Sequence, residues 1–426
     1  MLSRYSSRAP LWKYLGGAAS SRAGDEMTGP ALLLLGFAVT GRPAAGSAVL
    51  AGLTIAAAMG GPLFGALLDR SPRPDRVLAV TLASYAVGIV AIAAAVGRVP
   101  LPLVVLLALA AGLFNPAVAG GWTAQLPRVV AGPELDRGFA LDAMSYSTAS
   151  LAGPALAAAV AATLGARIAV ITAAALVAAA LPSARSLSRF RPSRASAPPT
   201  EAGRAGAPVR RQVAAGFAAI VTRRPLLRAT LTSVVSYAGI GMLLVCCPVL
   251  GAQRLGGSAR GALLISAIAV ASLTANSVLA RWRPRGQPDV RVLASTLIIG
   301  ISMAAAAAAP GWLTMAAVAL GGAGEGPQLT ALFAVRHRES PEHMRGQIFT
   351  TAASLKIGGL AAGTALAGPL AGRSVTACLL VAAGIELCAA AAYLLVPHKP
   401  VPGAKPRSAS GGAAERDTSA RSAEKS

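Results

Sequence analysis

Long apolar stretches alternate with short charged segments along most of the chain. Twelve of these stretches hold roughly 20 residues, the length that a helix needs to cross ~30 Å of hydrocarbon. The pattern predicts membrane-spanning helices near residues 11–40, 47–68, 76–97, 100–124, 138–163, 165–182, 226–250, 258–280, 290–309, 312–334, 346–371 and 375–396. The first stretch is the least regular, because three charged residues interrupt it before a continuous apolar run begins at Met27.

The composition indicates that lipid rather than water is the main solvent. Of the 426 residues, 54% are hydrophobic and 13% are charged, and the mean hydropathy is +0.61. Soluble domains are about half apolar and about one quarter charged. Ala and Gly occupy much of the predicted helix surface, which favours close contacts between helices in a bilayer. The sequence therefore predicts an all-α membrane protein.

Two polar segments divide the chain. Residues 183–211 are rich in Pro, Ser and Arg and hold few apolar side chains, which is typical of a flexible linker. The segment after Pro397 has the same character. The predicted parts are a first half (1–182), a cytoplasmic linker (183–225), a second half (226–397) and a disordered cytoplasmic tail (398–426).

The positions of Lys and Arg predict the orientation. The net charge is +23, but no soluble module combines basic and aromatic residues, so nucleic acid is not an expected partner. With the amino terminus inside, the inner segments hold 31 of the 39 basic residues, and positively charged loops stay in the cytoplasm. The outer loops hold Arg42, Arg98, Arg167, Arg254, Arg260 and Arg373. We expect a multi-pass protein of the inner or plasma membrane with both termini cytoplasmic.

Other signals narrow the class of function. The first residues lack the apolar core and cleavage site of a signal peptide, so the first span is expected to stay in the mature protein. The four cysteines all fall in predicted spans and show no disulfide or metal-binding spacing. No G-x-x-x-x-G-K-[ST] motif occurs, which argues against direct ATP coupling. We expect no cofactor, no metal site and no enzymatic activity.

The two halves repeat one another in the same order and direction. Three pairs of segments correspond, with offsets of 215, 208 and 211 residues: RAPLWK (8–13) with RRPLLR (223–228), GPELDRG (132–138) with SPEHMRG (340–346), and LFNP ending at Pro116 with GEGP ending at Pro327. Parallel duplication of six-helix halves is found in one large class of transporters, whose substrate site lies where the halves meet.

A motif after the second predicted span resembles a family signature. GALLDRSPRPDR (65–76) is similar to the loop between the second and third helices of the major facilitator superfamily, roughly G-x-L-x-D-R-x-G-R-[KR]. The matching residues are Gly65, Leu67, Asp69 and Arg70, with downstream positive charge from Arg73 and Arg76, whereas Ser71 and Pro72 replace the expected glycine segment. The second half carries only a degenerate copy, SVLARWRPR, in which Arg281 replaces the aspartate.

The first span adds to this resemblance, since Gly24 and Asp25 stand where a bacterial exporter branch often has a Gly-Asp pair. The resemblance covers residues 8–396 and implies two six-helix bundles, alternating access and a monomer. It also implies that the signature loop latches the halves on the cytoplasmic side. In physical terms, Asp69 is expected to face the positive amino end of the eleventh helix near Arg345 and Gly346.

Charged residues at bilayer depth are costly and therefore candidates for function. Asp25 and Glu26 fall roughly 15–20 Å into the first helix, where one of them could carry a proton or attract a cationic substrate. The alternative is an intrahelical pair with Arg22, three and four residues earlier.

Glu325 and Lys356 fall in the tenth and eleventh spans. Glu325 lies in GGAGEGPQ, where Gly and Pro are expected to interrupt the helix. We predict an interhelical pair between the two residues; the alternative is that Lys356 reaches water and never meets the acid.

Four further polar residues receive weaker assignments. Asp142 is expected near the inner headgroups at the start of the fifth helix, in a structural role. Glu386 lies in the peripheral twelfth helix without a visible partner. Asn115 and Gln328 could bind substrate by hydrogen bonds or could serve contacts between helices.

The leading hypothesis is an efflux carrier that expels a small hydrophobic or cationic compound in exchange for protons. The fourth span has no basic residue, although proton-coupled drug exporters commonly carry an Arg there. An importer of an organic acid or amino acid, with Lys356 or Arg22 meeting the carboxylate, is the first alternative. A non-transporting receptor or scaffold that uses the linker or tail is the second.

Overall fold

The protein is described by a computed structural model. The described residues are 9–41, 43–130, 132–187, 208–257, 260–282 and 287–396. The predicted tail, residues 398–426, and residues 188–207 of the predicted linker lie outside them. Within the described ranges all regular structure is helical.

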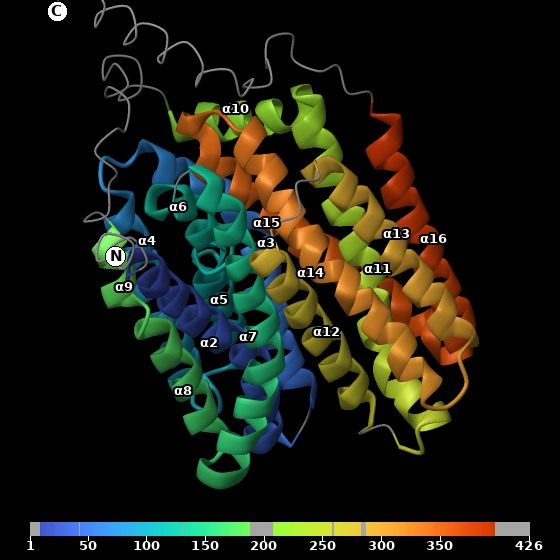
Figure 1. Ribbon diagram of the computed structural model, residues 1–426. Helices are drawn as coiled ribbons and strands as arrows, with labels where there is room; N and C mark the ends of the chain where they lie inside the picture. Colours follow the sequence, from blue (N-terminus) through green and yellow to red (C-terminus); the bar gives the residue numbers. More distant parts are fainter. Residues whose placement is uncertain are drawn as a thin grey trace, which may run out of the picture. The chain divides into compact units, whose positions relative to one another are not determined.

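The first half contains six crossings (Figure 1). Proline in the first turn marks the start of α4, where its missing N–H leaves no helical hydrogen bond unmade. The elements are α2 (Ala9–Thr40), α3 (Pro43–Arg70), α4 (Pro74–Ala95), α5 (Leu101–Gly112), η1 (Asn115–Ala117), α6 (Gly120–Val129), η2 (Gly132–Glu134), α7 (Leu135–Leu164), α8 (Ala166–Ala178) and α9 (Leu181–Ser186).

The second half repeats this order after one additional helix. The 3₁₀ turns η2 and η6 arise from the repeated PEL and PEH segments and precede equivalent helices. The elements are α10 (Val209–Thr222), α11 (Arg224–Arg254), α12 (Gly261–Trp282), α13 (Pro288–Ala308), α14 (Leu313–Glu339), η6 (Glu342–Met344), α15 (Arg345–Arg373) and α16 (Val375–Leu395). The prediction of an all-α membrane protein is confirmed within the described residues.

Three of the crossing helices are less apolar than the rest. Within the described ranges, nine helical spans are long and apolar enough to cross a membrane by composition. The other three crossings, α2, α14 and α15, have 32, 27 and 29 residues, so length does not exclude them. They are the helices that carry Asp25, Glu26, Glu325 and Lys356, and their polar content sets them apart.

The break in a helix occurs in the fourth crossing and not in the tenth. The prediction that Gly and Pro interrupt the tenth span is wrong, because α14 continues through Pro327. Glycine serves close packing there: a Cβ on Gly322 would overlap the backbone oxygen of Ile268 in α12. In the fourth crossing, Asn115 and Pro116 form η1 between α5 and α6, since proline removes a donor and crowds the preceding turn.

Part of the predicted flexible linker is a helix. Over residues 209–222, α10 buries Gly216 and Ile220 and leaves Arg210 and Arg211 exposed, which is the spacing of an amphipathic helix. It packs against α3, α11 and α15 and lies at the end of the bundle in Figure 1. We call this end of the bundle the linker side.

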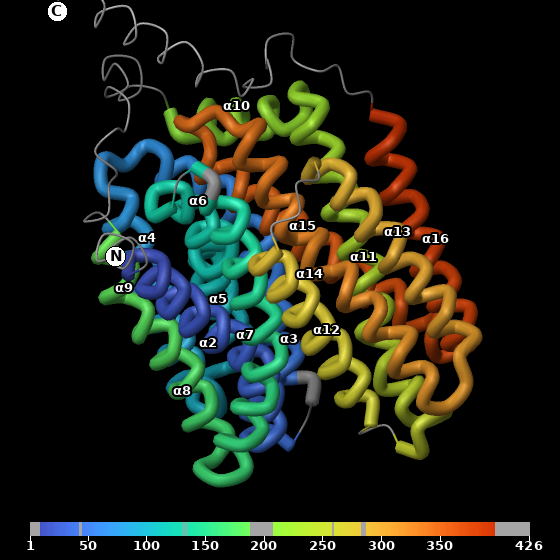
Figure 2. The backbone as a smooth tube through the Cα atoms, viewed as in Figure 1, coloured from blue at the N-terminus to red at the C-terminus, as the bar shows by residue number. Residues whose placement is uncertain are grey.

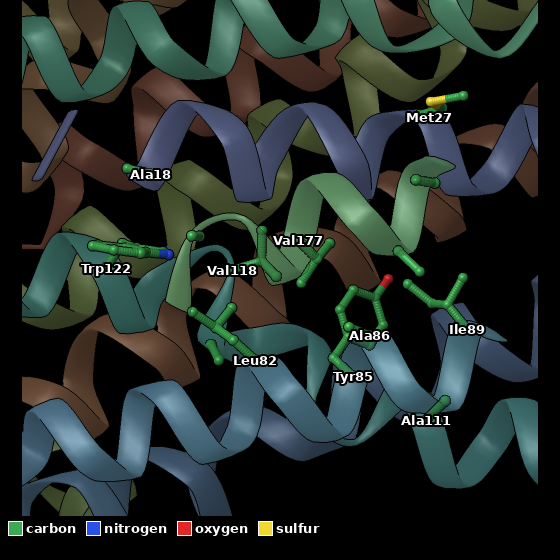
Figure 3. Close-up of a cluster of buried hydrophobic side chains, with 14 of the residues drawn as sticks. Ala18, Met27, Leu82, Tyr85, Ala86, Ile89, Ala111, Val118, Trp122 and Val177 are labelled. Carbon is green, nitrogen blue, oxygen red and sulfur yellow. The ribbon is translucent and has the colours of Figure 1, made fainter. Parts of the chain in front are cut away.

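Each half has its own packing core. In the first half, α2 packs on α7 and α8, and in the second, α11 packs on α15 and α16. Figure 3 shows the first core, where Leu82, Tyr85 and Ile89 of α4 meet Val177 of α8. Tyr85 is fully buried although it carries a hydroxyl group.

The halves meet along two helix pairs, α3 with α15 and α7 with α12 (Figure 2). Ser354 of α15 accepts a hydrogen bond from Gly61 N–H at 3.1 Å and donates to the carbonyl of Ala57 at 2.8 Å. Ser147 of α7 lies 2.8 Å from Ser272 of α12, oxygen to oxygen. The Ser354 contact lies in the half of α15 that begins at the linker side, whereas Ser147 and Ser272 lie near the middle of their helices.

Candidate functional site

A buried ion pair joins α2 to α7 in the first half. The guanidinium of Arg22 donates to Asp142 at 2.8 Å, and the two side chains are 2% and 0% exposed. Tyr14 and Thr123 also donate to this carboxylate, each at 2.8 Å. The guanidinium carbon lies 3.7 Å from the centre of the Tyr146 ring. Asp142 therefore has a cation and two hydroxyl donors.

This cluster excludes one alternative and corrects one prediction. Arg22 does not pair with Asp25 or Glu26 within its own helix, but reaches across to Asp142. Asp142 lies about 10 Å from the start of α7 and is fully buried, so it is stabilised by the ion pair rather than by headgroups and helix-end charge. Its structural role remains an expectation.

Asp25 is held by uncharged donors. Its Oδ1 accepts hydrogen bonds from the Tyr85 hydroxyl and from Nδ2 of Asn115, both at 2.6 Å. Asn115 is in η1, so the break in the fourth crossing places its amide beside the acid. Among the described residues no cation lies within 4.0 Å of this carboxylate.

Glu26 is exposed although it lies near the middle of α2. Its Oε1 accepts a hydrogen bond from Ser150 of α7 at 3.2 Å. The charges of Asp25, Lys356 and Glu325 all act on it. Glu26 therefore faces the second half, at a depth where an exposed acid must meet solvent or a ligand.

Glu325 and Lys356 both contact Tyr237. The Tyr237 hydroxyl donates to Oε1 of Glu325 at 3.4 Å, and Nζ of Lys356 lies 4.1 Å from the centre of the same ring. The predicted pair is not a direct contact within 4.0 Å, although the two charges act on one another. The three side chains are partly exposed. We call Asp25, Glu26, Glu325, Lys356 and Tyr237 the polar seam.

Gln328 and Glu386 lie behind the polar seam, within the second half. Gln328 is 1% exposed and donates to Thr296 at 2.8 Å and to Ser236 at 3.1 Å, which is a contact between helices. Glu386, expected to lack a partner, accepts a hydrogen bond from Ser236 at 2.9 Å. Its second oxygen is buried without a partner.

Tyrosine is the signal that sequence reasoning missed. The chain has only six tyrosines, and each of the five that the structure describes contacts an acid or a cation. They are Tyr14 with Asp142, Tyr85 with Asp25, Tyr146 with Arg22, Tyr237 with Glu325 and Lys356, and Tyr393 with Asp289 and Arg228. A rare hydroxyl-bearing aromatic in an apolar span thus marks the position of a charge.

The signature loop meets the second half at the amino end of α15. The two carboxylate oxygens of Asp69 accept hydrogen bonds from the backbone N–H groups of Gly346 and Gln347, both at 2.8 Å. A Cβ on Gly65 would overlap Gln347, so glycine permits this approach. The charge of Arg345 acts on Asp69, as does that of Arg128, which sequence reasoning did not select.

The remaining residues of the signature lie apart from this contact. Arg73 and Arg76 are exposed, and one guanidinium nitrogen of Arg70 is buried without a hydrogen-bond partner. The structure therefore brings together Gly65, Asp69 and Arg345 but not the two downstream arginines.

An aromatic cluster lies between the polar seam and the linker side. Phe139 of α7 lies 6.1 Å from Phe333 of α14 and 5.8 Å from His337, centre to centre. Phe333 also lies 6.1 Å from Phe349 of α15. These rings contact one another between the halves, on the linker side of the charged groups. Within the described residues, no group of three or more His, Cys, Asp or Glu side chains could hold a metal ion.

Comparisons with known proteins place this geometry in context. A sequence model described as Major Facilitator Superfamily matches residues 14–352. An uncharacterized MFS-type transporter, y4rN, from Sinorhizobium fredii (strain NBRC 101917 / NGR234) is 29% identical over 404 residues, which cover 92% of this chain and 96% of that protein.

Solved structures share the fold at low identity. The fucose:proton symporter FucP of E. coli aligns with a TM-score of 0.70 and 13% identity, over 92% of this chain and 100% of that one. The human organic anion transporter MFSD10 (TETRAN) gives 0.68 and 15%, over 91% and 99%. A bacterial homologue of the iron transporter ferroportin, in an outward-facing state, gives 0.71 and 16%, over 91% and 99%.

Proposed function

Since the chain belongs to the major facilitator superfamily and is a secondary transporter in a lipid bilayer, we propose that it expels small hydrophobic cations in exchange for protons. The observation that carries the proposal is the charge balance of the polar seam. Three acids, Asp25, Glu26 and Glu325, face two cations, Lys356 and the buried Arg336, because Arg22 is already neutralised by Asp142. A surplus of carboxylates at mid-depth attracts a cation or a proton.

In this proposal the three acids have two different roles. Asp25 carries the proton, since its partners Tyr85 and Asn115 are uncharged and no cation of the described ranges lies within 4.0 Å of its carboxylate. Glu26 and Glu325 attract the substrate cation, because each is accessible and held by one hydroxyl donor. Binding of a proton to Asp25 lowers the negative charge of the seam and favours release of the cation.

Alternating access follows from where the halves touch. With the basic linker side in the cytoplasm, the contacts at Asp69, Ser354 and the aromatic cluster close the cytoplasmic side. The arrangement is then the outward-facing state of a monomer in the cell membrane with both termini inside. Asp69 latches this state, because the amino end of α15 supplies two N–H donors and partial positive charge.

A proton-carrying acid can be separated from a structural one in reconstituted vesicles. Asp25→Asn should reduce uptake of tetraphenylphosphonium driven by an imposed pH gradient at least about tenfold, since the neutral amide cannot take up and release a proton. Exchange of labelled for unlabelled cation at equilibrium, with no gradient, should persist. Asp136→Asn, an exposed acid at the linker-side start of α7, serves as the control and should transport normally.

Two results would count against the proposal. Transport by the wild-type protein that ignores the pH gradient would remove proton coupling. Accumulation of an amino acid or organic acid inside cells would favour the importer, in which Lys356 meets the substrate carboxylate.

A further inference from the structure

We propose that Lys356 is a built-in competitor for the substrate, so that its ammonium group occupies the place of the substrate's cationic group until a substrate displaces it. This inference rests on the proposed function and specifies its substrate class. The class is a monovalent organic cation with apolar substituents, such as a quaternary ammonium or phosphonium compound.

The Lys356 ammonium lies beside two aromatic rings and near two acids. Its Nζ lies 4.1 Å from the centre of the Tyr237 ring and 5.6 Å from that of Tyr146. The charges of Glu26 and Glu325 also act on it. The electron-rich faces of tyrosine rings attract cations, and such rings recognise quaternary ammonium groups, which have no N–H to donate.

The groups that face Lys356 come from both halves. Tyr146 and Glu26 lie on α7 and α2, whereas Tyr237 and Glu325 lie on α11 and α14. Arg336 and Arg22 also act on the ammonium, with repulsion. A cation at this position therefore contacts the two bodies that must move relative to one another in alternating access.

The contacts that hold Lys356 are weak enough to be exchanged. It makes no ion pair within 4.0 Å and no hydrogen bond to another described residue. The nearby carboxylates accept hydrogen bonds from Ser150 and Tyr237 instead. Lys356 is also partly exposed, as are both tyrosines. A flexible side chain can leave such a position, and a free cation of higher ring affinity can take it.

Binding of tetraphenylphosphonium to the purified full-length protein in detergent tests the inference without transport. Lys356→Met should tighten binding about fivefold to tenfold, because the competitor is gone, and Lys356→Arg should bind like the wild type. Tyr237→Leu should weaken binding about fivefold, whereas Tyr237→Phe, which keeps the ring, should not.

The double variant separates competition for a site from simple charge repulsion. If Lys356 competes for the Tyr237 ring, Lys356→Met should no longer tighten binding in the Tyr237→Leu background. Equal tightening in both backgrounds, or weaker binding by Lys356→Met, would overturn the inference and leave proton-coupled cation efflux standing. If the wild type neither binds nor transports the cation, while Lys356→Met loses binding of benzoate, both the inference and the proposed function fail.

Discussion

Two groups of charged side chains lie inside the helical bundle of this protein and differ in burial and in pairing. In the first half, Arg22 and Asp142 are almost fully buried and form an ion pair, and two hydroxyl groups also donate to Asp142. In the polar seam, Glu325 and Lys356 stay partly exposed and both contact Tyr237 without a direct ion pair. The first group has its counter-charge in direct contact, and the second does not.

The difference teaches how a charge in a membrane protein should be interpreted. A buried carboxylate that is already paired with a cation and with hydroxyl donors is not available to a ligand. Its removal leaves the buried cation without a counter-charge. A charge that has one weak hydrogen bond and faces solvent can still bind. Whether a charge already has partners within the protein, and not its depth in the bilayer alone, separates structural charges from candidates for transport.

The largest expected effect comes from breaking the buried ion pair. Asp142→Asn should destabilise the folded protein by about 3–5 kcal/mol, because it leaves the buried guanidinium of Arg22 without its counter-charge. The midpoint of thermal unfolding in detergent should fall sharply, and little folded protein should be recovered.

The control for this change removes both charges together. Arg22→Met combined with Asp142→Leu should recover most of the lost stability, since apolar replacement of a buried pair is often close to neutral. If Asp142→Asn were as stable as the wild type but inactive in transport, Arg22 and Asp142 would belong with the seam and the comparison would be wrong.

An intermediate effect is expected at Asp69, whose partners are backbone groups of the other half. Asp69→Asn should weaken the outward-facing state by about 1–2 kcal/mol, because a neutral amide loses the attraction of the positive helix end. The measurement is the rate at which an impermeant maleimide labels Thr351→Cys, a buried position on α15, in a background without the native cysteines. Labelling from the linker side should speed up roughly fivefold to thirtyfold.

Asp136→Asn is again the matched control, and it should label at the background rate. Unchanged labelling and unchanged transport in Asp69→Asn would remove the latch from the proposed cycle.

The smallest effect is expected at Glu386, which is buried like Asp142 and accepts a hydrogen bond from Ser236. Among the described residues no cation lies within 4.0 Å of its carboxylate, so Glu386→Gln leaves no counter-charge unpaired and stability should change by less than about 1 kcal/mol. Thermal unfolding and proton-driven transport should both match the wild type. Loss of transport with normal stability would instead place Glu386 on the proton path and extend the site beyond the polar seam.

Much of the fold could be predicted from the sequence because hydropathy acts locally. Each crossing needs a sufficient length of apolar chain, and the Arg-rich turns and the repeated segments at 132–138 and 340–346 fix their order. The contact between Asp69 and the amino end of α15 could also be anticipated, because helix-end charge depends on where a helix begins. The mistaken break in α14 shows the limit of this reasoning, since glycine can serve packing against α12 instead of interruption.

The sequence by itself determined which residues are charged inside the membrane, and only the tertiary structure decided which of them are already paired. The partners of Arg22 lie 101–123 positions away along the chain, and the Tyr85 that holds Asp25 lies 60 positions away. No local pattern encodes such distances. Helices packed side by side bring these groups within hydrogen-bond range, and this packing separates a satisfied charge from an available one.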